Sequence, residues 1–178
     1  MKRHVSFILV LLLLALVMTS CQNDVSSVDE PATLPLSYFD TNPLYENLLS
    51  RIAPDQVPTG SSGEDVLATA LLESYPSAAN ISIVLYRADG RSHSFYYSDT
   101  FVYERLTEDG IWETVPYLVL DVGTAESDTK WKQAENGVAF VTVNRENIVW
   151  DKIPSGRYRV IAFVGKEPVA VCAYFNIK

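Results

Sequence analysis

The hydrophobic and polar positions divide the chain into three parts. Residues 5–17 are apolar apart from Ser6, and residues 22–63 are rich in Ser, Asp, Pro and Gly with scattered apolar positions. From about Glu64 onward, short strand-like runs alternate with turn signals. Such a succession without a long helix is typical of β-sandwiches and barrels. The pattern therefore predicts an all-β domain over residues 64–178, preceded by a segment of little regular structure.

The runs of the C-terminal part are rich in β-branched and aromatic residues, which favour strands. Turn signals at Asp89-Gly90, Glu108-Asp109-Gly110 and Gly165-Lys166 predict three hairpins. One further run, residues 65–73, is ambiguous because its Ala and Leu content favours a helix while its apolar residues also alternate. The other predicted strands are 81–86, 92–97, 99–106, 111–115, 138–143, 157–164 and 168–177.

The N-terminus has the order of an export signal. Lys2 and Arg3 form a basic start, the apolar run follows, and small polar residues end it. The run is shorter than the roughly 20 apolar residues that span a bilayer, which makes a transmembrane anchor the weaker interpretation. We therefore predict that residues 1–20 are a signal peptide that is removed.

Thr19-Ser20-Cys21 resembles a lipobox, although Met18 stands where Leu is usual. The resemblance implies cleavage before Cys21 and acylation of its sulfur, which would anchor the protein to a bacterial cell membrane on the extracytoplasmic face. The alternative is a soluble secreted protein whose cysteine lies near the cleavage site.

Residues 21–63 are predicted to be an acylated N-terminus and tether. Residues 25–35 and 54–63 have no usable hydrophobic period and too little apolar surface to offset the entropy of ordering. Between them, Asn42 as a cap and Pro43 at a first helical position predict a short helix at 42–50.

Composition narrows the classes of partner. Without residues 1–20, 12 basic and 22 acidic side chains remain, and this acidic balance makes nucleic acid an unexpected partner. Cys172 is the only cysteine besides Cys21. A lipidated Cys21 leaves no intrachain disulfide, and we expect Cys172 to be a small buried hydrophobe in an apolar strand.

Several stretches of the C-terminal part occur together in a recognisable order: Tyr75-Pro76-Ser77, 101–106, 109–112, 154–160 and 173–177. In this order, residues 64–178 resemble a bacterial immunoglobulin-like domain of lipoproteins and membrane-attached proteins of Gram-positive bacteria. The resemblance implies an immunoglobulin-like antiparallel β-sandwich in which residues 65–73 form a strand. Trp112 would be a core ring. Tyr158 would be the tyrosine corner, whose phenol bonds to nearby backbone.

Candidate catalytic and metal-binding residues are few. His93 is the only histidine after residue 4, so a site of several imidazoles is excluded, and we expect His93 on a solvent-facing strand. Asp121, Glu126 and Asp128 lie in an insert, residues 118–133, and match no calcium-loop spacing. We predict no catalytic residue, metal or cofactor, although a carboxylate pair formed only in space would permit glycoside hydrolysis.

Exposed aromatic side chains suggest binding. Tyr96 and Tyr97 are adjacent on a predicted strand, so one of them faces away from the core, and Trp131 is flanked by lysines in a polar segment. The sequence thus predicts a non-enzymatic, membrane-anchored lipoprotein whose domain binds a protein or glycan. An accessory or sensory subunit of a neighbouring membrane receptor or transporter is the alternative.

Overall fold

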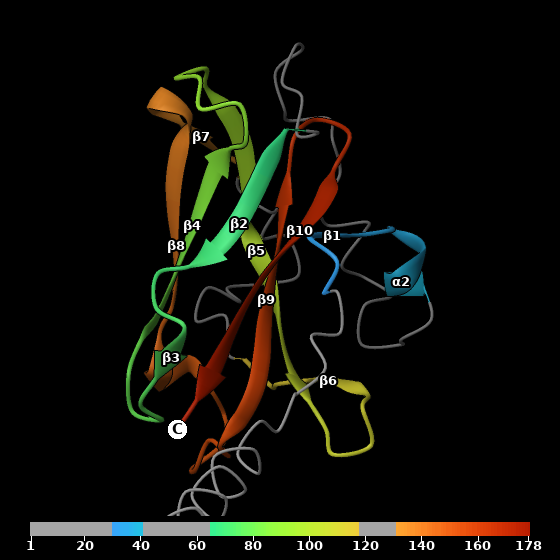
Figure 1. The fold of residues 1–178 in the computed structure, drawn as a ribbon, viewed down its shortest axis with the longest axis vertical. Coiled ribbons are helices and arrows are strands. Elements are labelled where there is room, and N and C mark those ends of the chain that lie inside the picture. Colours follow the sequence, from blue (N-terminus) through green and yellow to red (C-terminus); the bar gives the residue numbers. More distant parts are fainter. Residues whose placement is uncertain (1–29, 41–64, 118–130) are drawn as a thin grey trace, which may run out of the picture. The chain divides into compact units, whose positions relative to one another are not determined.

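The computed structural model describes residues 30–40, 65–117 and 131–178, and Pro31–Lys178 form one compact unit. The unit is an all-β sandwich of two sheets, which we call sheet A and sheet B, as predicted (Figure 1). Sheet B contains β2 (Val66–Ala70), β4 (Ile81–Arg87) and β8 (Val138–Val143) in the order β2-β4-β8. Sheet A contains β1 (Thr33–Leu34), β3 (Ser74–Tyr75), β5 (Phe95–Leu106), β6 (Trp112–Thr114), β7 (Trp131–Ala134), β9 (Gly156–Val164) and β10 (Val169–Ile177).

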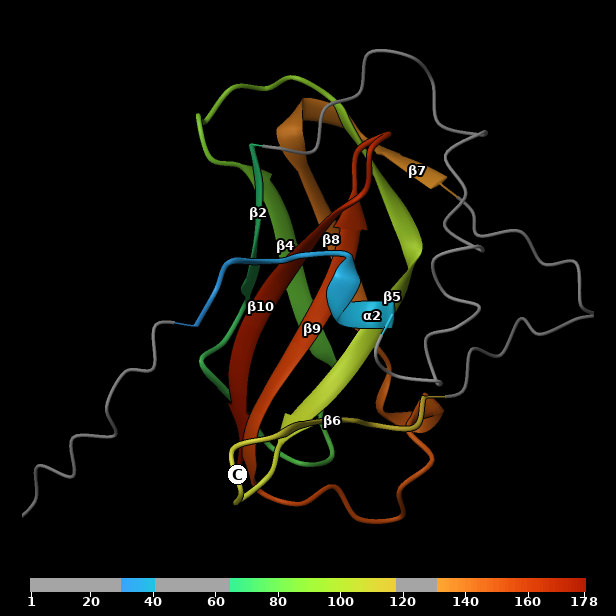
Figure 2. The ribbon, with the colours of Figure 1, turned by 90° about the vertical axis from the view of Figure 1, so that its right-hand side faces the viewer.

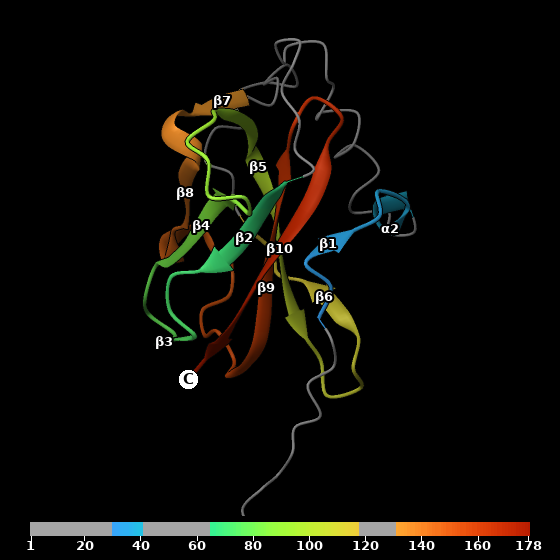
Figure 3. The same ribbon diagram turned by 45° about the horizontal axis from the view of Figure 1, so that its top comes forward.

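Sheet A is built on the central order β1-β10-β9-β5-β6, with β7 beside β5 and β3 beside β10. All pairings of both sheets are antiparallel except the short β3–β10 pairing. A single helical turn, α2 (Ser37–Asp40), follows β1. Figure 3 shows sheet B on one side of the sandwich and β1 with α2 on the other.

The main core lies between the two sheets. Alternate residues of β4 point inward, and so do those of β8, because successive side chains of a strand face opposite sides. Aromatic rings fill one end of this core, where Tyr103, Tyr158 and Phe175 lie within 6.1 Å of one another, centroid to centroid. Each such buried side chain contributes roughly 1.5–3 kcal/mol by leaving water.

Several predicted elements are confirmed. The ambiguous run at 65–73 forms a strand, β2. The turn at Glu108-Asp109-Gly110 joins β5 to β6, and Gly165 joins β9 to β10 in a hairpin. Gly110 and Gly165 both have positive φ, a conformation that glycine adopts without steric cost.

The predicted hairpin at Asp89-Gly90 is wrong. β4 belongs to sheet B, whereas the next strand, β5, belongs to sheet A. Residues 91–94 form no strand, so the chain crosses between the sheets there. The predicted strands 92–97 and 99–106 are one long strand, β5, whose pairing with β9 shifts register between Tyr97 and Phe101.

The predicted start of the domain at Glu64 is also too late. Residues 31–40 form β1, which pairs with the edge of β10, and α2, which lies over the outer side of sheet A (Figure 2). Residues 33–35 were expected to be spacer, but β10 supplies them with a partner that the sequence does not reveal locally. The helix predicted at 42–50 and the signal peptide at 1–20 lie outside the described residues.

The tyrosine corner is confirmed as a contact. The hydroxyl of Tyr158 donates a hydrogen bond to the carbonyl oxygen of Pro154 at 2.7 Å, four residues upstream. Tyr158 itself is fully buried, so this bond satisfies its hydroxyl and fixes the chain that enters β9.

Candidate functional site

The outer face of sheet B is apolar and uncharged. Leu67, Val84, Tyr86, Val138 and Phe140 are neighbours across its three strands, and we call them the sheet B face. Phe140 is 64% exposed and Val138 43%. The other outward positions of these strands are Thr and Ser, so no charged side chain interrupts the face. Contiguous exposed apolar surface of this kind marks interaction sites.

The edge of sheet B at β8 adds a backbone feature to this face. Among the described residues, β8 pairs only with β4, which leaves its second edge without a strand partner. Its sequence, Val138–Val143, contains no charged residue and no proline. Natural edge strands are usually protected by such residues, because free backbone groups accept another strand. β8 is therefore a ready template for strand addition.

The outer face of sheet A is covered by residues 31–40, which we call the N-terminal strap. Phe39 is 1% exposed, and its ring centroid lies 5.2 Å from that of Phe163. Around it, a second hydrophobic cluster forms on the outer side of the sheet, from Val102, Ile161, Phe163, Ala170 and Cys172. The strap thus gives sheet A a buried layer on both of its faces.

Backbone contacts hold the beginning of the strap. Thr33 and Leu34 pair with Val171 and Ala170 of β10. The backbone amide of Cys172 donates to the carbonyl oxygen of Ala32 at 2.8 Å. These bonds satisfy β10 along an edge that would otherwise be free.

A buried ion pair lies beneath the strap. Arg159 of β9 and Glu104 of β5 are register neighbours, and Nη2 of Arg159 lies 2.6 Å from Oε2 of Glu104. Their side chains are 2% and 1% exposed. The hydroxyl of Tyr38 donates to Oε1 of Glu104 at 2.9 Å and accepts from Nη2 of Arg159 at 2.8 Å. One strap side chain therefore bonds to both members of the pair.

Aromatic rings complete the surroundings of Arg159. Its guanidinium carbon lies 4.2 Å from the ring centroid of Trp112 and 5.1 Å from that of Tyr38, within the range of cation–π attraction. Trp112 is half-buried on the outer side of sheet A and was predicted to be a core ring between the sheets. That prediction is wrong, because its strand, β6, presents this ring to Arg159.

The electrostatics of the cluster favour the charged form of Arg159 and the neutral form of Tyr38. Burial acts to lower the pKa of Arg159, but the Glu104 carboxylate outweighs it and the pKa is raised. Burial and, next, the negative charge of Glu104 raise the pKa of Tyr38, Arg159 acts to lower it, and the pKa lies at about 12. Tyr38 therefore stays a neutral hydroxyl at ordinary pH. The cluster is suited to holding the strap in place.

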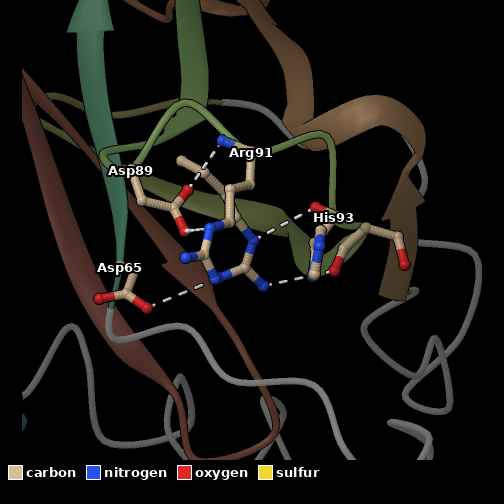
Figure 4. Close-up of polar contacts among 6 residues, drawn as sticks. Asp65, Asp89, Arg91 and His93 are labelled. Atoms are coloured by element: carbon tan, nitrogen blue, oxygen red, sulfur yellow. Dashed lines mark hydrogen bonds and ion pairs between the residues drawn. The ribbon is translucent and has the colours of Figure 1, made fainter.

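A second polar cluster fixes the crossing between the sheets (Figure 4). Arg87, at the end of β4, donates from Nε to the carbonyl oxygen of His93 at 3.2 Å and from Nη2 to that of Ser94 at 3.3 Å. Its Nη1 lies 3.9 Å from Asp65. His93 is exposed, but it lies in the loop 91–94 and not on a strand as predicted. The described contact of His93 with this cluster is made by its backbone.

The predicted exposed aromatics have two different outcomes. Tyr96 points away from the core, where its hydroxyl donates to Oε1 of Gln133 at 3.1 Å, while Tyr97 packs against the core as expected for adjacent strand residues. Trp131 was expected in a polar loop. It begins β7 and is partly buried against the cluster beneath the strap, so it does not form a free binding surface.

The remaining predicted residues are the two cysteines and the acidic residues of the insert. Cys172 is buried, as expected, and forms no disulfide with another cysteine of the described residues. Cys21, Asp121, Glu126 and Asp128 lie outside the described residues. Within 30–40, 65–117 and 131–178, no three His, Cys, Asp or Glu residues gather as metal ligands. In the same ranges, no helix has the length and hydrophobicity needed to cross a bilayer.

Four residues of these surfaces and clusters were not predicted as candidates, namely Tyr38, Glu104, Arg159 and Phe140. A signal existed for two of them, since Glu104 and Arg159 are charged residues inside long apolar strands, where a buried partner is needed. Tyr38 carried no comparable signal, because a tyrosine beside apolar Leu36 and Phe39 does not indicate a buried ion pair as its partner.

Comparison with known proteins identifies no family for this chain. No family model and no curated protein matches the chain. Among solved structures, an alkylpurine DNA glycosylase from Pseudomonas fluorescens matches at 12% identity and a TM-score of 0.32, over 64% of this chain and 30% of that one. A β-glucosidase from Listeria innocua bound to glucose matches at 10% identity and a TM-score of 0.34, over 63% and 15%.

A chain from a structure of T-cell activation by the superantigen toxic shock syndrome toxin-1 matches at 12% identity and a TM-score of 0.30, over 64% of this chain and 98% of that one. This chain thus spans less than a third of the glycosylase and of the glucosidase. All three TM-scores are low, and these similarities support no inference about activity.

Proposed function

We propose that this protein is a lipid-anchored extracytoplasmic lipoprotein whose immunoglobulin-like sandwich binds another macromolecule through the sheet B face. The observation that carries the proposal is the contrast between the two outer faces of the sandwich. The face of sheet A is covered by the N-terminal strap, whereas Phe140 and Val138 on sheet B are exposed.

The sheet B face has the properties of a binding surface. It combines exposed apolar side chains with a strand edge that no other strand of the described residues pairs with, so a partner would gain both hydrophobic burial and backbone hydrogen bonds. Keeping such an uncharged edge exposed carries an aggregation hazard, which a partner would remove.

The anchoring half of the proposal is supported by the N-terminal sequence. The basic start, the apolar run and the lipobox-like residues before Cys21 form the order expected for a lipoprotein precursor. Several acyl chains on one cysteine would hold the protein stably, since each buried CH₂ contributes about 0.8 kcal/mol.

Anchoring is tested by labelling cells with a radioactive or clickable fatty acid. The wild-type chain should take up label and remain with membranes, and Cys21→Ser should lose the label and leave the membrane fraction. A Cys21→Ser chain that still fractionates with membranes through its N-terminus would contradict the anchoring.

Binding is tested by placing a photo-cross-linking amino acid at Phe140 in cells. A discrete adduct should form there and should be absent with the same group at Lys166, in the β9–β10 turn. Phe140→Asp should abolish binding of the partner so identified while leaving the unfolding midpoint nearly unchanged, because the side chain is exposed. Equal cross-linking from both positions would contradict a binding role for the face.

A further inference from the structure

The N-terminal strap determines how far the sandwich can move from the lipid anchor, and this limits the choice of partner. We propose that the docked strap holds the sandwich near the membrane, so that the sheet B face binds the extracytoplasmic part of an integral membrane protein. The inference rests on the lipid anchoring proposed above.

The connection between Cys21 and the folded unit is short. Only residues 22–30 separate Cys21 from Pro31, the first residue of the folded unit. An extended chain spans at most 3.3–3.6 Å per residue, so this connection reaches about 35 Å. If the strap were undocked, residues 22–65 would connect Cys21 to β2 and would reach about 150 Å. Docking therefore shortens the maximum reach about fourfold.

Several contacts hold the N-terminal strap against sheet A. Phe39 is buried against Phe163, Tyr38 bonds to both Glu104 and Arg159, and the hydroxyl of Tyr174 donates to the carbonyl oxygen of Pro31 at 2.9 Å. Removal of the strap would expose the buried ion pair without its hydroxyl partner and would uncover the apolar cluster around Phe39. Both effects oppose undocking.

The chemistry of the sheet B face restricts the kind of partner that can bind there. The face has no charged side chain, so it suits an apolar, uncharged partner segment that extends β8 by a strand. A glycan would require more polar groups than the Ser and Thr at its margins. A second copy of the chain would bring another strongly acidic molecule close, since 12 basic and 22 acidic side chains follow residue 20. A membrane protein, by contrast, presents its extracytoplasmic segments within the reach set by the docked strap.

The proposal predicts a dependence on tether length. The effective concentration of a tethered module falls roughly as the −3/2 power of the linker length once the linker is long enough to span. Lengthening the connection from residues 22–30 to about 50 residues should therefore lower occupancy roughly tenfold when binding is unsaturated.

The experiment uses the full-length lipidated protein in its own membrane, with a photo-cross-linking amino acid at Phe140. One variant carries about 40 Gly and Ser residues inserted between Asn23 and Asp24, which leaves the folded unit unchanged. A second variant, Tyr38→Ala with Phe39→Ala, releases the strap. Asp40→Ala, an exposed change in the same helical turn, is the matched control for the second.

We expect an adduct with an integral membrane protein whose yield falls roughly tenfold in the insertion variant and in the strap variant, and is unchanged in Asp40→Ala. The proposal is overturned if the insertion leaves the yield unchanged, if the adduct is a dimer of this chain, or if it is released by a glycan-digesting enzyme. Absence of any adduct at Phe140 also overturns it. Fatty-acid labelling of Cys21 is scored in the same cells, so a failure of anchoring is distinguished from a failure of this inference.

Discussion

Tyr38 donates its hydroxyl hydrogen to Oε1 of Glu104 at 2.9 Å, across 66 positions of the sequence. This bond joins a residue before the predicted domain to a buried carboxylate in the middle of sheet A. It places the N-terminal strap inside the folded unit, and the expected effects of substitution follow from its surroundings.

Glu104→Gln should strongly destabilise the domain. The change leaves the Arg159 guanidinium buried without its counter-charge, which typically costs 3–5 kcal/mol. Urea unfolding of Cys21→Ser protein measures the effect, and Glu113→Gln on the exposed side of β6 is the control. Equal unfolding midpoints for the two substitutions would show that the buried pair contributes nothing to stability.

Alkaline pH should destabilise the fold. The pKa of Tyr38 rises from its ordinary 10.0 to about 12 in the folded chain. Burial raises the pKa of Tyr103, Tyr158 and Tyr174 as well. Between pH 10 and about 12 the unfolded chain therefore holds fewer protons than the folded chain, so stability is full below pH 10 and falls as pH rises.

Tyrosinate absorbance and circular dichroism, followed together through this pH range, measure that loss. Part of the tyrosinate signal should appear only as the fold is lost, and Tyr38→Phe should reduce this part. Complete tyrosine ionisation with an unchanged fold would contradict the expected shifts.

Tyr158→Phe should destabilise the domain by about 1 kcal/mol, since it removes the hydrogen bond to Pro154 and keeps the ring. Tyr96→Phe is the matched control, because its hydroxyl bonds to Gln133 in an exposed position. Thermal unfolding of both variants is sufficient. A larger effect at Tyr96 would mean that the corner at Tyr158 is energetically unimportant.

Arg87→Met should loosen the loop 91–94. The guanidinium donates to the carbonyl oxygens of His93 and Ser94, and the substitution removes both bonds while keeping the aliphatic stem. Hydrogen exchange of amides 88–94 should accelerate. Arg91→Met, at a side chain that is 71% exposed, should leave the same amides unchanged.

Cys172 should report on the strap. Its thiol is buried in the cluster that Phe39 covers, so a thiol reagent should react slowly with Cys21→Ser protein. Phe39→Ala should increase the reaction rate by opening the cover, whereas Asp40→Ala should not. Equal rates in the two variants would show that the strap does not limit access to Cys172.

The strands of the sandwich could be predicted because their signals are local. Alternation within residues 81–87 and the glycine turn at Gly165 depend only on neighbouring residues. The hairpin at Asp89-Gly90 failed because a turn signal gives a change of direction and does not specify which sheet the next strand joins. In this chain, the hydrogen bonds from Arg87 to the carbonyl oxygens of His93 and Ser94 hold the segment that crosses from sheet B to sheet A.

The strap could not be predicted from its own sequence. Residues 31–40 form one short, proline-interrupted segment whose apolar side chains, Leu34, Leu36 and Phe39, do not indicate which surface they cover, and their stability comes from β10 and β9, far along the chain. A clue lay in β9, where Tyr158–Val164 are all buried. A strand that is apolar on both faces requires cover on both, and that requirement predicts a covering segment without identifying it.

The pairing of Leu34 with Ala170 also sets an order of assembly. A chain made from its N-terminus produces the strap early, but β10, the strand that receives it, lies far along the chain. Until β10 has paired with β9, Phe163 and Ile161 lack their cover, and a chain that ends before Val169 never acquires it. Closure of the strap thus requires β10 to be in place, so a chain that lacks β10 should leave residues 31–40 and the cluster beneath them more accessible to proteases.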